Sequence, residues 1–308
     1  MKSQIAQTSK GPIEFTLLGS GPVILVCHGT SSNCHSTHAF ESLVNAGFSL
    51  LTPSRPGYGR TPLEVGRSNT QAAEALIALL DSLKIQSCSV IAVSGGGPTG
   101  IVLAAKFPKR VQRLVLMAAV SRPEDRPNEP SYKNQMAFYG PFHGVMWNTL
   151  RLISNLSPQK MAKQTLAIFS LHDPNDAANR LSPEGIEAIR RFYQGQSSRL
   201  GALNDATHTV GKELLEAVSA PALVIHSRED KSVPFSHAEW SLRHLSQAVL
   251  CEAGFTGHFI WVEPDYKNIV EQLASFLRAD HMDSKLNSTC QISMERDNSE
   301  YGHSTNSL

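Results

Sequence analysis

The chain has 308 residues, enough for one large domain with an insertion, and its hydrophobic (41%) and charged (18%) fractions are typical of a folded globular protein. A formal net charge of +1 at pH 7, with Lys and Arg scattered along the sequence, gives no electrostatic basis for binding nucleic acid or an anionic membrane surface. Residues 1–10 lack the apolar segment of a signal peptide, and no apolar run reaches the roughly 18 residues that span a bilayer.

The first 120 residues alternate between short apolar runs and helical patterns. An edge strand is expected over residues 13–18, and an uninterrupted apolar run at 23–27 predicts a central strand buried on both faces. Residues 69–83 carry apolar side chains at helical spacing. This alternation predicts an α/β fold with a mostly parallel, doubly wound sheet, whose site lies at the carboxyl ends of the strands.

The pattern changes between residues 121 and 210, where prolines and helical stretches replace the strands. A helical insertion between two strands predicts a cap over the site. It divides the core into residues 1–120 and 211–280. The insertion carries several large apolar side chains, which either line a pocket or pack the cap onto the core: Phe138, Tyr139, Phe142, Met146 and Trp147.

Residues 281–308 are polar and aperiodic, which predicts a disordered tail. The final Asn306-Ser307-Leu308 only approximates the peroxisomal Ser-Lys-Leu signal, and a Ser284-Lys285-Leu286 lies inside the tail. The chain has 5 cysteines and no Cys-x-x-Cys pair. A reduced, cytoplasmic protein is therefore the expectation, with a peroxisomal location as the weaker alternative.

The stretch over residues 89–100 passes from an apolar strand through glycines into a helix, and it admits two interpretations. Ser94 stands at the strand-to-helix corner, where a hydroxyl would be exposed at the top of the sheet. Gly95, Gly97 and Gly100 also satisfy the Gly-x-Gly-x-x-Gly pattern of dinucleotide-binding proteins. The second interpretation leaves Ser94 without a role. It also requires a carboxylate at the end of the next strand to hold the ribose, and the sequence has none there.

Three chemically complementary residues follow three predicted strands in the order Ser94, Asp230, His258. Ser94 lies in Ala-Val-Ser-Gly-Gly, Asp230 precedes Lys-Ser-Val-Pro, and His258 lies in Gly-His-Phe. Together with a His28-Gly29 turn and an Arg-Pro-Gly-Tyr-Gly loop at residues 55–59, these motifs resemble the α/β-hydrolase superfamily. One departure is Ala92, which stands where that family's Gly-x-Ser-x-Gly elbow has its first glycine.

The resemblance implies a role for each of these residues. Ser94 would be the nucleophile, His258 its base, and Asp230 the carboxylate that orients the imidazole. The backbone N–H groups of Thr30 and Gly95 would bind the oxyanion, supported by the loop of His28 and Gly29. No cofactor and no metal are expected.

Alternatives remain at this stage for the acid and for a metal. Glu229 would replace Asp230 if the loop shifted by one residue. Glu124 or Asp125 could also be the acid, because they follow the predicted strand at residues 113–120. Cys34, with His35 and His38, would make an incomplete metal site without a fourth ligand.

The leading function is hydrolysis of an ester, thioester or related acyl bond of a small, fairly apolar molecule. The same fold and residues could instead perform carbon–carbon bond hydrolysis, a lyase step or a cofactor-free peroxidase-like reaction. A receptor-like binding protein and a dinucleotide-dependent oxidoreductase are the alternatives from other classes. The oligomeric state cannot be predicted from the sequence.

Overall fold

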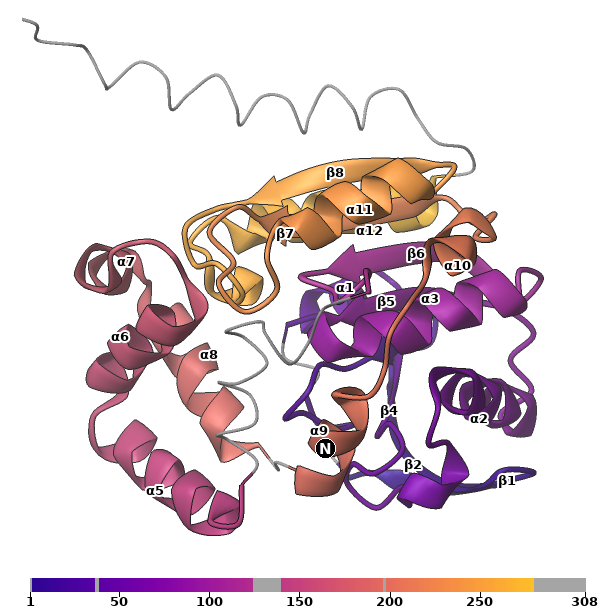
Figure 1. Ribbon diagram of the computed structural model, residues 1–308, viewed down its shortest axis with the longest axis horizontal. Helices are drawn as coiled ribbons and strands as arrows, with labels where there is room; N and C mark the ends of the chain where they lie inside the picture. The colour runs from indigo at the N-terminus through magenta and orange to yellow at the C-terminus, as the bar shows by residue number, and fades with distance from the viewer. Residues whose placement is uncertain (1, 37–38, 124–139, 196–197, 280–308) are drawn as a thin grey trace, which may run out of the picture.

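The computed structural model describes residues 2–36, 39–123, 140–195 and 198–279. Its centre is an eight-stranded sheet in the order β1-β2-β4-β3-β5-β6-β7-β8 (Figure 1). β2 pairs antiparallel with β1 and β4, and all other neighbours are parallel, which confirms the predicted fold class. The strands are β1 (Gln4–Thr8), β2 (Gly11–Leu18), β3 (Val23–Cys27), β4 (Ser49–Pro53), β5 (Cys88–Val93), β6 (Val111–Met117), β7 (Ala222–Ser227) and β8 (Ala248–Ala253).

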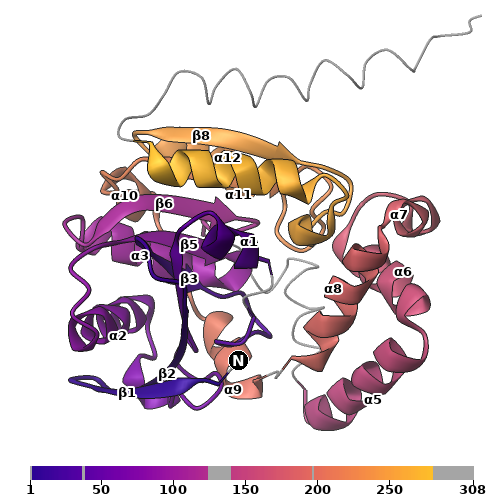
Figure 2. The ribbon, with the colours of Figure 1, turned by 180° about the vertical axis from the view of Figure 1, so that it is seen from behind.

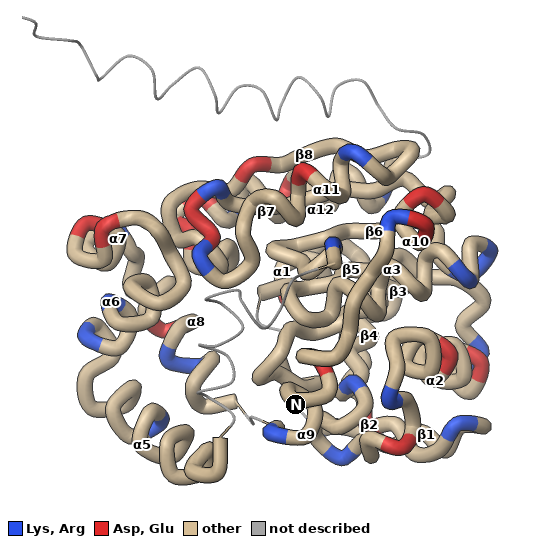
Figure 3. The backbone as a smooth tube through the Cα atoms, viewed as in Figure 1, with Lys and Arg blue, Asp and Glu red and all other residues tan. Residues whose placement is uncertain are grey.

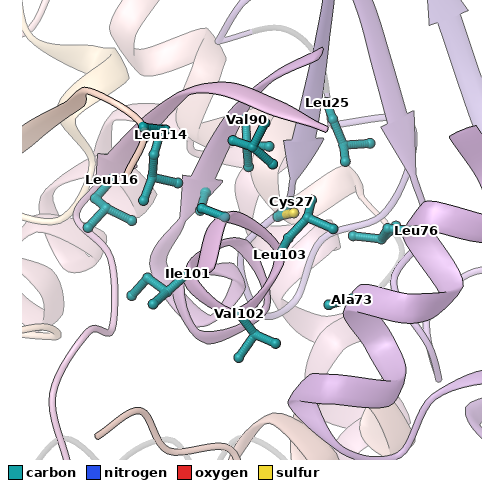
Figure 4. Close-up of a cluster of buried hydrophobic side chains, with 14 of the residues drawn as sticks. Leu25, Cys27, Ala73, Leu76, Val90, Ile101, Val102, Leu103, Leu114 and Leu116 are labelled. Carbon is teal, nitrogen blue, oxygen red and sulfur yellow. The ribbon is translucent and has the colours of Figure 1, made fainter. Parts of the chain in front are cut away.

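Helices cover both faces of the sheet, so β5 and β7 are buried along their whole length. One face packs against α2, α3, α10 and α11 (Figure 1), and the other against α1 and α12 (Figure 2). These helices are α1 (Glu41–Asn45), α2 (Asn69–Ser82), α3 (Gly97–Lys106), α10 (Lys212–Glu216), α11 (Ser236–His244) and α12 (Tyr266–Arg278). On the face covered by α2 and α3, buried side chains of the central strands pack against those of the two helices, including Leu25, Val90, Leu76 and Leu103 (Figure 4).

Between β6 and β7, the regular secondary structure of the described residues is helical, apart from an isolated bridge at Ser170. Four of its helices form a block beside the sheet, which we call the cap (Figure 1). They are α5 (His143–Leu156), α6 (Pro158–Phe169), α7 (Pro174–Arg180) and α8 (Pro183–Gln194). Three of them begin with proline, which fits a helix's first turn because its missing N–H needs no partner there. A fifth helix, α9 (Arg199–Asp205), lies beside the core, where Gly201 approaches Gly57.

Two sequence expectations are wrong in the described residues. Residues 13–18 belong to β2, but β2 is not an edge strand, because the polar segment Gln4–Thr8 pairs along it as β1. That strand is largely exposed, so its sequence carries no apolar alternation. Phe142 does not line a pocket; it is 78% exposed at the start of α5, whereas Trp147 one turn later is buried.

Other expectations fall outside the described residues, namely those on His38, Glu124, Asp125, Phe138, Tyr139 and the tail 281–308. Within the part that is described, no helix combines the length and the apolar character needed to cross a bilayer. Acidic and basic residues are interspersed over the core and cap, as Figure 3 shows.

Candidate active site

Ser94 lies at the sharp corner between β5 and α3. Its φ of 49° is in the left-handed region, which is uncommon for a residue with a side chain, and its carbonyl accepts a hydrogen bond from Val120 N at 3.0 Å. A serine held in this way is presented at the carboxyl edge of the sheet. The local strain indicates a functional position.

Close packing explains the glycines after Ser94. A Cβ on Gly96 would lie 2.2 Å from the carbonyl oxygen of Cys27, and one on Gly97 would lie 2.2 Å from that of Val120. A Cβ on Gly100 would lie 2.5 Å from the Cβ of Ala92. Ala92 therefore replaces the first elbow glycine because the facing helix has a glycine at the point of contact.

The same packing bears on the dinucleotide interpretation. Gly95, Gly97 and Gly100 each face protein atoms, since a Cβ at any of the three would approach another residue within 2.5 Å. In a dinucleotide-binding loop the second glycine leaves the backbone open to the pyrophosphate, whereas here that position is Gly97, which packs against the Val120 carbonyl. These glycines instead serve the packing of the elbow.

His258 joins Ser94 to Asp230. Its Nε2 lies 3.0 Å from Ser94 Oγ and accepts the hydroxyl proton, while its Nδ1 donates to Asp230 Oδ2 at 2.8 Å. Asp230 is 2% exposed and His258 is 6% exposed, so the series is shielded from bulk water. The structure thus brings the three predicted residues together from parts of the chain up to 164 positions apart.

The loop after β7 holds the Asp230 carboxylate by its other oxygen. Oδ1 accepts hydrogen bonds from the backbone N–H groups of Ser232 and Val233, each at 2.8 Å. His226 donates from Nε2 to Val233 O at 2.8 Å and lies 3.5 Å from Asp230 Oδ2. Burial lowers the pKa of His226, which keeps it neutral. The sequence offered no specific signal for this second histidine.

Glu229, the sequence alternative for the acid, is not the residue that meets His258. The imidazole nitrogen bonds to the Asp230 side chain, whereas the Glu229 carbonyl accepts from Leu171 N at 2.8 Å. The residue that follows β7 by three positions thus provides the carboxylate.

The His28-Gly29-Thr30 loop lies beside Ser94. A Cβ on Gly29 would lie 3.2 Å from Ser94 Cβ, and one on Gly95 would lie 2.2 Å from Thr30 Oγ1. His28 accepts the Arg55 N–H on Nε2 at 3.0 Å and donates from Nδ1 to Gly29 O at 2.8 Å. Burial, with the Arg55 charge, lowers the pKa of His28 to about 3, so it is a neutral support for the loop.

A cavity of about 140 Å³ opens at Ser94 between this loop and the cap. Its apolar walls come mainly from aromatic side chains of the cap and of the loop after His258: Trp147, Phe169, Phe192, Tyr193, Phe259 and Trp261. Small hydroxyl residues also line the cavity: Ser31, Ser32 and Ser36. Lys231 is the sole lysine, arginine or carboxylate residue among the described lining residues.

Cys34 and His35 belong to the group that the sequence analysis describes as an incomplete metal site, and in the structure their ligand atoms and those of Glu14 lie within 4.8 Å of one another. Each Glu14 oxygen, however, already accepts hydrogen bonds, from Ser3 and Arg60 on one side and from Ser54 and Arg60 on the other. Burial raises the pKa of the Cys34 thiol to about 11. This donor set is a poor fit for a metal ion, because metals bind the thiolate.

The family model described as alpha/beta hydrolase fold matches residues 22–265. An uncharacterized hydrolase of Bacillus subtilis (strain 168), YcgS, is 35% identical over 272 residues, which cover 87% of this chain and 96% of that protein. A 2-hydroxy-6-oxononadienedioate/2-hydroxy-6-oxononatrienedioate hydrolase of Pseudomonas putida is 24% identical over 265 residues, 82% of this chain and 84% of that one.

Among solved structures, an alpha/beta hydrolase fold protein from Nakamurella multipartita superimposes with a TM-score of 0.78 at 26% identity. The match covers 91% of this chain and 100% of the other. Fold, sequence and family model agree over nearly the whole described core. This chain belongs to the alpha/beta hydrolase fold family.

Proposed function

We propose that this protein is a serine hydrolase that cleaves an ester, thioester or related acyl bond of a small, largely apolar substrate. The observation that carries the proposal is the hydrogen-bonded series Ser94, His258 and Asp230 beside an aromatic-walled pocket. A free serine hydroxyl is a poor nucleophile at neutral pH. An adjacent imidazole that takes its proton makes it a competent one.

The proposed reaction has two steps, acylation of Ser94 and hydrolysis of the acyl-enzyme. His258 Nε2 takes the Ser94 proton as Oγ bonds to the acyl carbon and the carbonyl electrons move to oxygen. Asp230 holds the Nδ1–H and stabilises the imidazolium. The tetrahedral intermediate then expels the leaving group, which takes the proton from His258. Water repeats the sequence on the acyl-enzyme, so that ester and water give acid and alcohol.

The negative charge on the substrate oxygen needs donors beside Ser94. We assign this role to the backbone N–H groups of Thr30 and Gly95, which belong to adjacent loops. Removing one donor of this kind typically costs about a hundredfold in rate.

The pocket lining favours an uncharged acyl group. The Pseudomonas putida relative is named for a dioate, whose two carboxylates call for matching cations. Here the lining offers one exposed lysine, Lys231, whose Nζ also donates to Ala167 O at 3.1 Å. Aromatic walls match an alkyl or aryl acyl chain better than a diacid.

A screen with p-nitrophenyl esters from acetate to decanoate tests the proposal, together with a fluorophosphonate probe of active serines. We expect turnover and labelling that Ser94→Ala abolishes, with activity reduced by at least about 10³-fold. Ser275→Ala, on the exposed side of α12, is the matched control and should behave like the natural protein.

Other outcomes would overturn the proposal. Equal labelling of Ser94→Ala would remove the nucleophile. Turnover of a 2-hydroxy-6-oxo dienoic acid without any esterase activity would favour carbon–carbon hydrolysis. Tight binding of esters without product release would favour a receptor.

A further inference from the structure

Asp205, the last residue of α9, is buried against the loop that carries Thr30, 175 positions earlier in the chain. Its Oδ1 accepts from Arg55 Nη1 at 2.6 Å. Its Oδ2 accepts from Arg55 Nη2 at 2.6 Å, Tyr58 OH at 2.7 Å and Thr30 Oγ1 at 2.8 Å. A carboxylate with four such donors is held firmly in one orientation.

Arg55 binds the same loop at His28. Its Nε donates to His28 O at 2.7 Å, and its backbone N–H donates to His28 Nε2 at 3.0 Å. Side chains of Arg55 and Asp205 are 2% and 7% exposed, so these bonds are made away from solvent. The His28-Gly29-Thr30 loop is therefore fixed at its start by Arg55 and at its end by Asp205.

This network lies next to Gly95 and Thr30, the two residues proposed to bind the oxyanion. A Cβ on Gly95 would lie 2.2 Å from Thr30 Oγ1 and 3.2 Å from Asp205 Oδ2. The carboxylate thus lies directly behind the two residues whose N–H groups are assigned to the oxyanion. An uncompensated negative charge there would oppose the oxyanion, but Arg55 supplies the matching positive charge through two parallel hydrogen bonds.

The protonation state agrees with this arrangement. Burial alone would raise the pKa of Asp205, but the charge and hydrogen bonds of Arg55 lower it overall. Asp205 is thus an ionised acceptor for the Thr30 hydroxyl at neutral pH.

We propose that Asp205 and Arg55 are positioning residues that hold the Thr30 N–H in place for the oxyanion, with the Thr30 hydroxyl as the connecting link. This inference rests on the proposed serine hydrolase function. It also assigns a task to the segment that returns the chain from the cap, since α9 delivers Asp205 to the site.

Replacing Asp205 or Arg55 is a poor test, because the remaining charge would be buried without its partner and the protein can unfold. Thr30 offers a cleaner pair of variants. Thr30→Val keeps the side-chain shape and removes the hydroxyl, whereas Thr30→Ser keeps the hydroxyl and removes a methyl group. Both retain the backbone N–H itself.

We expect Thr30→Val to lower kcat about tenfold, with KM and Tm nearly unchanged. This loss is smaller than the roughly hundredfold loss for removing an oxyanion donor, because the Thr30 N–H is still present. The affinity of Thr30→Val for a trifluoromethyl ketone, which forms an oxyanion on Ser94, should fall by a similar factor. Thr30→Ser should recover most of both quantities.

Equal kcat and ketone affinity for the valine and serine variants would overturn the inference. So would a loss in Thr30→Val that appears only as a lower Tm. Ser94→Ala, measured in parallel, distinguishes a failure of the proposed function from a failure of the positioning inference. An active Ser94→Ala variant removes the proposed function itself, whereas an inactive one leaves the Thr30 comparison as the test of positioning.

Discussion

The two walls of the pocket are built by different forces. On the core side, Ser94, Thr30 and Asp230 are tied to neighbours by hydrogen bonds of 2.8–3.0 Å. On the cap side, the wall consists mainly of aromatic rings in contact with one another, such as Phe192, which meets Phe259 edge to face with centroids 5.0 Å apart. Hydrogen bonds fix atoms in one geometry, whereas apolar packing tolerates changes of similar volume. For the proposed hydrolase we therefore expect the core wall to govern the reaction and the cap wall to govern the choice of substrate.

The two walls meet at the C-terminal end of α6. Phe169 O accepts from His258 N at 3.1 Å and from Lys231 N at 3.3 Å, so one cap carbonyl contacts the loops that carry His258 and Asp230. Gly257 has a φ of 65°, and a Cβ there would lie 2.5 Å from the same carbonyl. This contact joins the cap directly to the loop that carries His258.

The largest expected effect lies on the core wall. Asp230→Asn removes the charge that stabilises the imidazolium and allows the wrong tautomer, so kcat should fall by about 10⁴-fold. Ester hydrolysis at saturating substrate measures it. Glu229→Gln, one residue earlier, is the matched control and should retain full activity. If Glu229→Gln loses as much activity as Asp230→Asn, the assignment of the acid is wrong.

The fold and the hydrogen-bonded series could be predicted because their signals are local. Apolar runs mark β3 and β5, and short motifs surround Ser94, Asp230 and His258. A motif of a few residues encodes a turn whose backbone geometry depends mainly on those residues. The pairing of three such turns then follows from the parallel sheet, which gathers the ends of its strands at one edge.

Other parts of the site depend on contacts that no local pattern encodes. Asp205 lies in a seven-residue helix, and its partner Arg55 is 150 positions earlier. The cap aromatics show the same limit, since Phe142 and Trp147 occur in one helical stretch but only Trp147 faces inward. Their orientation depends on how the cap packs, which periodicity alone does not define.

The second prediction concerns the elbow as a packed unit. Gly100→Ala would place a Cβ 2.5 Å from Ala92 Cβ, so we expect a loss of about 2–3 kcal/mol in unfolding free energy. Chemical denaturation measures it. Adding Ala92→Gly should restore most of the loss, because the extra methyl is then removed from the facing strand.

A glycine on the cap provides the comparison for that prediction. Gly144, in α5, has no atom within 4 Å of the position a Cβ would take. Gly144→Ala should therefore raise the stability slightly, by about 0.5 kcal/mol, through better helix propensity. Similar losses at both glycines would contradict the contrast between a tightly fixed core wall and a tolerant cap.

The third prediction concerns the cap wall, where the expected effect depends on the substrate. Phe192 lines the pocket, so Phe192→Ala should lower kcat/KM for a long-chain ester about 30-fold, the equivalent of about 2 kcal/mol of lost apolar contact. An acetyl ester, too short to reach the ring, should lose less than about threefold. Phe142→Ala removes an equal side chain from the outer surface of the same cap and should leave both substrates unaffected. A uniform loss for long and short esters would instead mean that Phe192 supports the geometry of His258 through Phe259, and the division of labour between the walls would not hold.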